Sequence, residues 1–169
     1  MMNNVEAHPF APFVPPNAII LIVGSFAGRE TTRRVPDDKQ WFYGTKRNQF
    51  WKILTDIYRI ELPDREAKQN LFGKYGIGIA DLFLRIKRKS ASNSDDALVI
   101  VEYNDKIIAE ILEKYNFDTI YFTSQFVGRH FAKLFPDVKN TDFLPSPSQR
   151  YARMSLSDKT AFYKAKLPH

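Results

Sequence analysis

The sequence of 169 residues contains no cysteine, and this absence excludes several kinds of site. Disulfides, thiolate nucleophiles, iron–sulfur clusters and cysteine-ligated zinc all require that residue. The three histidines, His8, His130 and His169, lie far apart and lack the spacing of metal ligands. We therefore expect no metal and no cofactor.

Long apolar runs are missing too. No run approaches the ~20 residues that a membrane-spanning helix needs. The polar residues 1–6 lack the pattern of a signal peptide. We expect a cytoplasmic protein with no membrane partner, and because nothing in the sequence demands a partner chain, we expect a monomer.

The composition is that of one folded domain, with 44% hydrophobic and 26% charged residues. The 25 Lys and Arg exceed the 19 Asp and Glu, which gives a net charge of +6. A positive balance favours a polyanionic partner such as nucleic acid. Charge alone leaves this open, since many basic proteins bind no polyanion.

Residues 1–17 are rich in proline and predict an irregular lead-in to a single domain over 18–169. Continuous apolar runs predict strands, and apolar residues at helical spacing after capping residues predict helices. The predicted strands cover 19–23, 78–83 and 118–122, with a polar loop over 85–96. The predicted helices run from 46 or 48 to about 58, from 63 to 73 or 76, over 104–115 and 125–135, and from 155 through 163.

This alternation predicts an α/β fold, a three-layer α/β/α sandwich around a mostly parallel central sheet. Ligands of such sheets bind outside the carboxyl ends of the strands. The loops at 24–28, 81–96, 123–125 and 145–151 should therefore converge at that edge.

Two segments stand out at opposite ends of the chain. Gly24-Ser25-Phe26-Ala27-Gly28 follows the first strand and could hold a small planar group against its backbone, although a plain tight turn is the competing interpretation. It lacks the residues of a phosphate-binding P-loop and the glycine pattern of dinucleotide sites. Near the C-terminus, a rigid loop could press into a nucleic-acid duplex: Leu144-Pro145-Ser146-Pro147-Ser148-Gln149-Arg150-Tyr151.

With a third segment, Tyr43-Gly44-Thr45-Lys46-Arg47-Asn48-Gln49-Phe50-Trp51, the chain resembles the uracil-DNA glycosylase superfamily. The mismatch-specific uracil/thymine and hypoxanthine-DNA glycosylase branches are the most similar. They carry a Gly-x-x-Pro-Gly loop, an aromatic residue before Asn-x-Phe-Trp, and a late Leu-Pro-x-Pro-Ser loop. The motifs occur here in the same order across residues 18–167.

The resemblance implies an enzyme that flips a deaminated base, uracil or hypoxanthine, out of DNA and hydrolyses its N-glycosidic bond. Gly24 and Tyr43 fall at base-binding positions, Tyr43 as the ring that stacks on the base, although it could instead belong to the core. Ser124 falls where the superfamily places a base-reading side chain. Backbone N–H groups around Ser25 and Phe26 could bind a base carbonyl as its charge grows.

Phe26 occupies the position at which other branches use Asn or Asp to hold the attacking water. The resemblance to the hypoxanthine branch assigns that task to Asn48, which could also cap the following helix. The histidine usual in the late loop is absent. Asp81 is a second candidate carboxylate, for which a surface or capping role is the stronger expectation.

The late loop, Ser146 to Tyr151, lies where the superfamily inserts side chains into the duplex. Basic side chains could neutralise phosphates on either side of the flipped nucleotide. The candidates are Arg29, Arg33, Arg34, Lys46, Arg47, Lys87, Arg88, Lys89 and Arg153, with Arg47 and Arg88 foremost.

Two other functions remain open at this point. Phe26 and the missing histidine suit a DNA-binding relative without catalysis. A similar sheet and pocket could also serve a hydrolase of free nucleosides or nucleotides.

Overall fold

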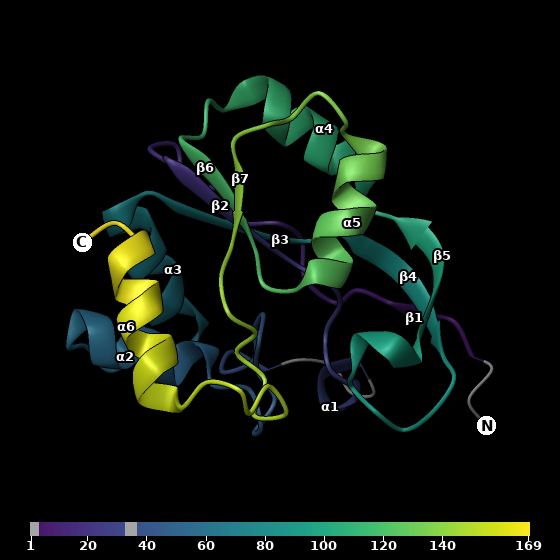
Figure 1. Ribbon diagram of the computed structural model, residues 1–169, viewed down its shortest axis with the longest axis horizontal. Helices are drawn as coiled ribbons and strands as arrows, with labels where there is room; N and C mark the ends of the chain where they lie inside the picture. Colours follow the sequence, from purple (N-terminus) through teal and green to yellow (C-terminus); the bar gives the residue numbers. More distant parts are fainter. Residues whose placement is uncertain (1–3, 33–36) are drawn as a thin grey trace.

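The computed structural model describes residues 4–32 and 37–169 of the protein. A sheet of four parallel strands lies at its centre, in the order β3-β2-β6-β7 (Figure 1). The predicted α/β class with a mostly parallel central sheet is therefore confirmed. The strands are β2 (Ile20–Gly24), β3 (Ile77–Asp81), β6 (Thr119–Phe122) and β7 (Thr141–Phe143).

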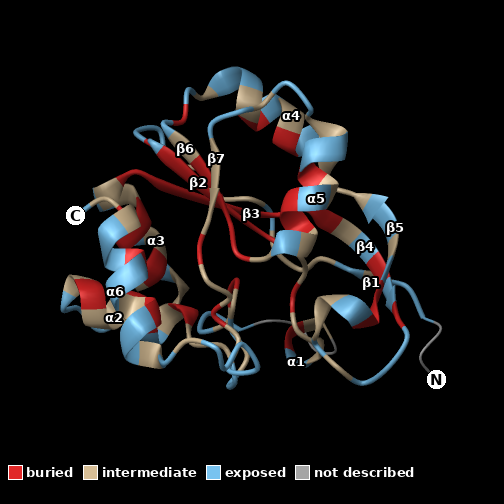
Figure 2. Cartoon of the chain, in the orientation of Figure 1, coloured by how far each residue is buried: buried red, intermediate tan, exposed pale blue. Residues whose placement is uncertain are grey.

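Helices cover both faces of this sheet, because the central strands are apolar on both sides. Ile20 and Ile22 of β2 pack toward one group of helices, and Leu21 and Val23 pack toward the other. Figure 2 shows the buried sheet between the two groups. The first group is α2 (Phe50–Tyr58), α3 (Arg65–Tyr75) and α6 (Leu156–Lys166), and the second is α4 (Asp105–Lys114) and α5 (Gln125–Leu134).

Side-chain caps explain where three of these helices begin. The Asp64 carboxylate accepts a hydrogen bond from the Ala67 N–H, and the Ser155 hydroxyl accepts one from Asp158. Ser124 does the same for Val127 at the start of α5. Such caps satisfy N–H groups that the helix leaves free. The predicted helix starts agree with the structure to within two residues at these sites.

A second, antiparallel sheet was not predicted. It has the order β1-β4-β5, and its strands are β1 (Glu6–Ala7), β4 (Phe83–Arg88) and β5 (Leu98–Tyr103). The polar loop predicted over 85–96 is wrong for its first four residues, because Phe83, Ile86 and Arg88 turn inward while Arg85 and Lys87 face solvent. The remainder contains a short 3-10 turn at Asp95–Ala97.

Residues 4–17 are irregular for most of their length but pack onto the domain. Glu6 and Ala7 pair with β4, and Phe13 forms a bridge with Ile79 of β3. These contacts bring His8 beside the end of β3. Within the described residues, no helix is long and apolar enough to cross a membrane.

Candidate active site

The carboxyl ends of β2, β3 and β6 meet at one edge of the sheet and enclose a small cavity. Its volume is about 120 Å³, well below the ~300–1,000 Å³ of sites for drug-sized ligands. A group no larger than one base therefore suits it better than a whole nucleotide. The lining residues are Ser25, Phe26, Ala27, Gly28, Tyr43, Gly44, Thr45, Asn48, Asp81, Asn93, Asp95, Thr123, Ser124, Ser146, Pro147 and Ser148.

The cavity brings together the three segments singled out in the sequence. The turn after β2 contributes Ser25 and Phe26, the segment before α2 contributes Asn48, and the late loop contributes Ser146 and Ser148. Because these segments are far apart in the chain, their meeting at one cavity supports the resemblance on which they were chosen.

The turn after β2 presents backbone N–H groups to the cavity. The carbonyls of Gly24 and Ser25 accept hydrogen bonds from Leu82 and Phe83. In a trans peptide group the N–H points away from the carbonyl of the same group. The N–H groups of Ser25 and Phe26 therefore face the side opposite to Leu82 and Phe83. Across residues 4–32 and 37–169, neither N–H has a backbone acceptor. The turn therefore offers two free donors in the wall of the cavity.

Glycine is required at position 24 because two side chains occupy the space that a Cβ would need. A Cβ placed there would lie 2.5 Å from both Asp81 Oδ1 and the Tyr43 hydroxyl, closer than real Cβ atoms approach. Gly24 and Asp81 are also register partners in the parallel pair β2–β3. The absence of a side chain at Gly24 thus lets the carboxylate and the phenol reach the cavity floor.

Asp81 is buried, at 6% exposure, and does not have the surface or capping role that its sequence position suggested. Its Oδ2 lies 2.6 Å from His8 Nε2, and both side chains are nearly inaccessible. The other ring nitrogen of His8 lies 2.9 Å from the carbonyl of Phe10. His8 therefore fixes one oxygen of Asp81, so that the second oxygen, Oδ1, is the one above Gly24.

Tyr43 belongs both to the cavity wall and to the core. One face of its ring stacks on Phe50 with the centroids 4.3 Å apart, and its hydroxyl lies 2.9 Å from Thr123 Oγ1. Burial, followed by the Asp81 charge, raises the pKa of the phenol well above its usual value, so it stays neutral. Its φ of 57° is uncommon for a non-glycine residue, and such strain often accompanies functional sites.

Asn48 lies at the cavity, as expected, but the N-cap position of α2 belongs to its neighbour Gln49. The Asn48 side-chain oxygen accepts a hydrogen bond from the Phe50 N–H, 2.9 Å away, at the start of α2. The neighbouring backbone ties this segment to the late loop. Gln49 donates to the Pro147 carbonyl, and Gln149 donates to the Arg47 carbonyl. The side-chain amide of Asn48 is thereby held at the cavity mouth.

Ser124 and Asp95 form a polar pair on the opposite wall. The Ser124 hydroxyl donates to Asp95 Oδ2 at 2.9 Å while it caps α5. The Ser25 hydroxyl also acts on this carboxylate, but burial has the larger effect and raises the pKa of Asp95. Ser124 therefore reaches the cavity together with a carboxylate that the sequence did not single out.

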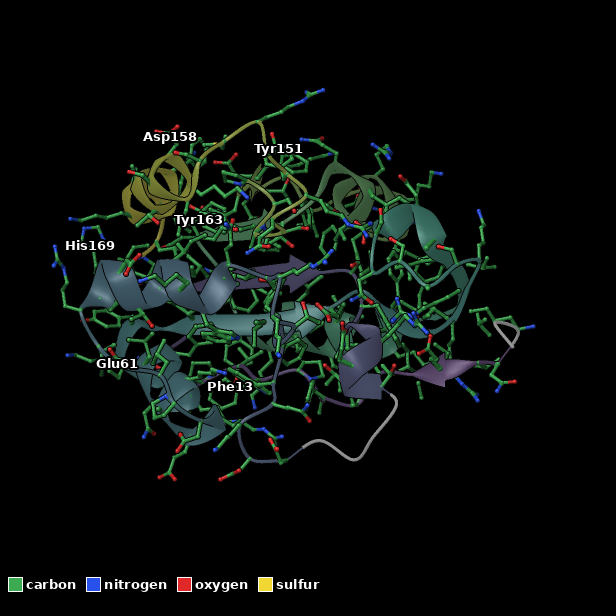
Figure 3. All side chains as sticks on the ribbon, turned by 90° about the horizontal axis from the view of Figure 1, so that it is seen from below. Phe13, Glu61, Tyr151, Asp158, Tyr163 and His169 are labelled. Atoms are coloured by element: carbon green, nitrogen blue, oxygen red, sulfur yellow. The ribbon has the colours of Figure 1, made fainter. Side chains whose placement is uncertain are left out.

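A larger groove of about 580 Å³ opens outside the small cavity. Arg47, Arg150 and Tyr151 line it, and Gln149 is exposed at the turn of the late loop. Figure 3 shows Tyr151 on the loop that leads into α6. Arg150 Nη1 donates to the Ser92 hydroxyl across the groove, at 2.6 Å. The exposed Arg47 and Arg150 thus lie at the entrance, as expected for Arg47 and the late loop, together with the carboxylates of Glu30 and Asp95.

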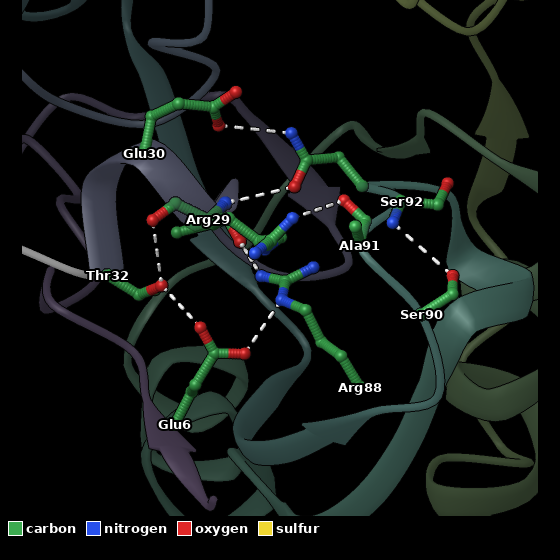
Figure 4. A network of polar contacts seen from close by, with 10 residues as sticks. Glu6, Arg29, Glu30, Thr32, Arg88, Ser90, Ala91 and Ser92 are labelled. Atoms are coloured by element: carbon green, nitrogen blue, oxygen red, sulfur yellow. Dashed lines mark hydrogen bonds and ion pairs between the residues drawn. The ribbon is translucent and has the colours of Figure 1, made fainter. Parts of the chain in front are cut away.

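Arg88 is not available for a phosphate, and this expectation is corrected. Its guanidinium is buried, pairs with Glu6 at 2.7 Å, and donates to the Ala27 carbonyl at 2.7 Å (Figure 4). Arg88 therefore supports the turn that lines the cavity. Arg33 and Arg34 lie outside the described residues.

The side chain of Phe26 has no polar atom that could hold water. Its ring packs edge-on against His8, with the centroids 5.2 Å apart, and the Arg88 guanidinium lies 5.8 Å from its centroid. The contribution of Phe26 to the cavity is therefore its backbone N–H.

A parallel sheet with a small cavity at its carboxyl edge and a larger groove outside it defines an α/β domain with its ligand site at the strand ends. Comparison with known proteins gives the family. The sequence model of the Uracil DNA glycosylase superfamily matches residues 11–167, and the chain belongs to that superfamily.

Among solved structures, the chain is similar to a candidate uracil DNA glycosylase from Methanosarcina acetivorans, determined by solution NMR. The two share 26% sequence identity with a TM-score of 0.69, over 96% of this chain and 98% of the other. Among curated proteins, no match was found.

Sequence reasoning missed three residues of this site: His8, Asp95 and Thr123. His8 comes from the proline-rich lead-in, and Asp95 comes from a serine-rich loop whose path depends on the unpredicted strands β4 and β5. Thr123 had a usable signal, since it directly follows a buried parallel strand, as Asp81 ends another.

Proposed function

We propose that this protein is a monofunctional DNA N-glycosylase that removes a deaminated base, uracil or hypoxanthine, and leaves an abasic site. The observation that carries the proposal is the pairing of free N–H donors in the turn with the Asp81 carboxylate in one small cavity. Removal of such a base would begin its repair.

Deaminated bases carry a carbonyl beside a ring N–H, and the cavity offers the complement of that edge. The N–H groups of Ser25 and Phe26 suit the carbonyl oxygen, and Asp81 Oδ1 suits the ring N–H. Cytosine and adenine instead present an unprotonated ring nitrogen, whose lone pair would face a carboxylate. Such an unfavourable contact disfavours cytosine and adenine.

The same donors suit the reaction. As the glycosidic bond breaks, negative charge grows on the base carbonyl and positive charge grows on the sugar. A positioned N–H donor at such a carbonyl contributes on the order of 10²–10³ in rate. The Asn48 oxygen keeps a second lone pair free after bonding Phe50, and this lone pair can hold the attacking water.

The outer groove suits a DNA strand. Arg47 and Arg150 would contact phosphates, and the rigid loop from Ser146 to Tyr151 would fill the space that the flipped nucleotide vacates. One chain contains both cavities, so we propose that the protein acts as a monomer on damaged DNA.

A panel of labelled duplexes tests this function. Each carries one uracil, hypoxanthine, thymine opposite guanine, or a normal base, and alkali reveals abasic sites after incubation. We expect cleavage at uracil or hypoxanthine and none at normal bases. Absence of strand breaks with every lesion would refute the proposal. Hydrolysis of free nucleosides at a comparable rate would instead indicate the nucleoside hydrolase.

Asn48→Ala tests the water-holding role. We expect the single-turnover rate to fall by at least about 100-fold, the cost of misplacing a reacting group by roughly 1 Å. Loss of the hydrogen bond to the Phe50 N–H should lower the free energy of unfolding by about 1 kcal/mol, which leaves the protein folded. Asn70→Ala, at an exposed site on α3, is the matched control. Equal rates for wild type and Asn48→Ala would remove Asn48 from the mechanism.

Phe26 favours one second candidate, a DNA-binding protein without catalysis. Its ring cannot orient water in the position where related enzymes use a polar side chain. Tight, salt-sensitive binding to abasic duplex with no excision of any lesion would select this candidate.

A further inference from the structure

The small cavity and the outer groove share a narrow boundary. The residues that line both are Thr45, Asn48, Asn93, Asp95, Ser146 and Ser148. If the base occupies the cavity and the strand occupies the groove, as the proposed function requires, the glycosidic bond must cross this boundary. The six residues therefore surround the reacting bond.

Asp95 is the ionisable member of this set. Its carboxylate is held by the Ser124 hydroxyl, and its backbone carbonyl accepts a hydrogen bond from Leu98 at the end of the 3-10 turn. The loop that leads to it is braced by Arg29, which donates to the Ala91 carbonyl at 2.8 Å and to Asn93 Oδ1 at 2.9 Å (Figure 4). The carboxylate thus has a fixed position.

No basic side chain of the described residues forms an ion pair with Asp95. The charges that act on it are Asp81 of β3 and its neighbour Asp96, and both raise its pKa. His130 of α5 experiences the Asp95 charge in turn. A half-buried carboxylate without a cation is costly to keep. Such groups in clefts are candidates for function.

We propose that Asp95 is a catalytic carboxylate of this glycosylase. It lies where positive charge develops on the sugar, and it holds the attacking water together with Asn48. The water oxygen forms a bond to the anomeric carbon, and the water proton passes to Asp95. The carbon–nitrogen bond breaks, and its electron pair leaves with the base as an anion bound by the turn N–H groups. The base then takes up a proton from solvent, and Asp95 releases its own.

Asp95→Asn is the decisive variant, because it keeps the shape and the acceptor for Ser124 but removes the charge. Single-turnover excision is measured between pH 4.5 and 9, on the lesion that the wild type cleaves. We expect a loss of at least about 100-fold at pH 7. The wild-type rate should also rise with pH as Asp95 ionises, and the variant should lose that rise. Asp96→Asn, at the exposed neighbouring carboxylate, should keep the wild-type rate at pH 7 and the rise with pH, and the rise should begin at the same or a slightly lower pH because one charge that raises the Asp95 pKa is gone.

Binding to abasic-site duplex and thermal melting separate catalysis from structure. A catalytic role predicts unchanged melting cooperativity and near-normal abasic binding for Asp95→Asn. Asp95→Ser, which is smaller and also neutral, gives the same comparison should the first variant fail to fold.

The outcomes distinguish the two proposals. If the wild type excises a lesion and Asp95→Asn retains its rate within threefold and its pH profile, the role of Asp95 is wrong and the glycosylase function stands. A loss of rate that parallels an equal loss of abasic binding would also overturn the catalytic role. If the wild type excises no lesion, both proposals fail.

Discussion

Single residues in the cavity have conformations and environments that cost stability. Tyr43 has a left-handed backbone, Asp81 is a buried carboxylate next to His8, and Asp95 is a half-buried carboxylate next to two hydroxyls. Each would be easier to accommodate as a different residue if folding were the sole requirement. Their concentration at one strand edge is therefore consistent with a reaction site.

The free energy of unfolding of Asp95→Asn should measure the cost of keeping the Asp95 charge in this environment. Burial raises the pKa of Asp95 in the folded protein, so the folded state binds a proton more tightly than the unfolded state. The free energy of unfolding then falls as the pH rises from the unfolded pKa through the folded one. At pH 7 we expect the variant to be more stable by roughly 0.5–2 kcal/mol, the usual gain of a stabilising substitution.

Urea denaturation at several pH values measures this difference. The advantage of Asp95→Asn should shrink below pH 4, where both states of the wild type carry the proton. A variant that is less stable than the wild type at pH 7 would contradict the assigned environment of Asp95.

Among the elements, α6 positions the late loop. Tyr163 and Lys159 lie one turn apart on this helix and are almost fully buried. The Tyr163 hydroxyl donates to the Pro145 carbonyl at 2.6 Å, and the Lys159 ammonium donates to the Ser148 carbonyl and to Gln49 Oε1, each at 2.9 Å. The helix thus holds the loop against the start of α2.

Tyr163→Phe should weaken this support. Loss of the hydrogen bond should lower the free energy of unfolding by about 0.5–1.5 kcal/mol and reduce affinity for abasic duplex. Tyr58→Phe is the matched control, since the Tyr58 hydroxyl donates to the Pro168 carbonyl at the same 2.6 Å, away from the loop. Chemical denaturation and fluorescence anisotropy measure both variants. An equal change in DNA affinity would show that α6 does not position the loop.

The elements differ in how well the sequence predicts them. The helices carry local signals, such as the caps Asp64 and Ser155, so their starts were found. Strand β4 was missed because its inward set includes the charged Arg88, which is neutralised by Glu6 from a distant part of the chain. The same long-range ion pair made Arg88 a wrong candidate for a phosphate contact.

At the scale of the whole molecule, the net charge of +6 reaches a strand in the groove through the basic side chains that are exposed near it. Arg47 and Arg150 are exposed and line the groove, whereas Arg88 is internal. The family motifs around Asn48 and in the late loop predicted which segments meet, because proteins that carry the same motifs in the same order share a topology. They could not predict His8 or Asp95, whose positions depend on pairings across the second sheet.

The salt dependence of DNA binding should identify the exposed contacts. Each phosphate contact contributes about −0.9 to the slope of log affinity against log salt. We expect Arg47→Ala and Arg150→Ala each to reduce that slope by about 1. Lys106→Ala, at an exposed lysine of α4, should leave it unchanged. Titrations with duplex DNA at 50–200 mM salt test this, and unaltered slopes for both arginine variants would place the strand elsewhere.

The bond between His8 and Asp81 spans 73 positions, and that between Gln49 and Lys159 spans 110. A chain emerging from the ribosome therefore carries His8 without its partner until more than eighty residues exist. The late loop cannot take its final position until α6 has been synthesised. Partly synthesised chains should therefore lack a complete cavity. The ability of the cavity to bind a ligand should appear in one step, late in synthesis, and not gradually.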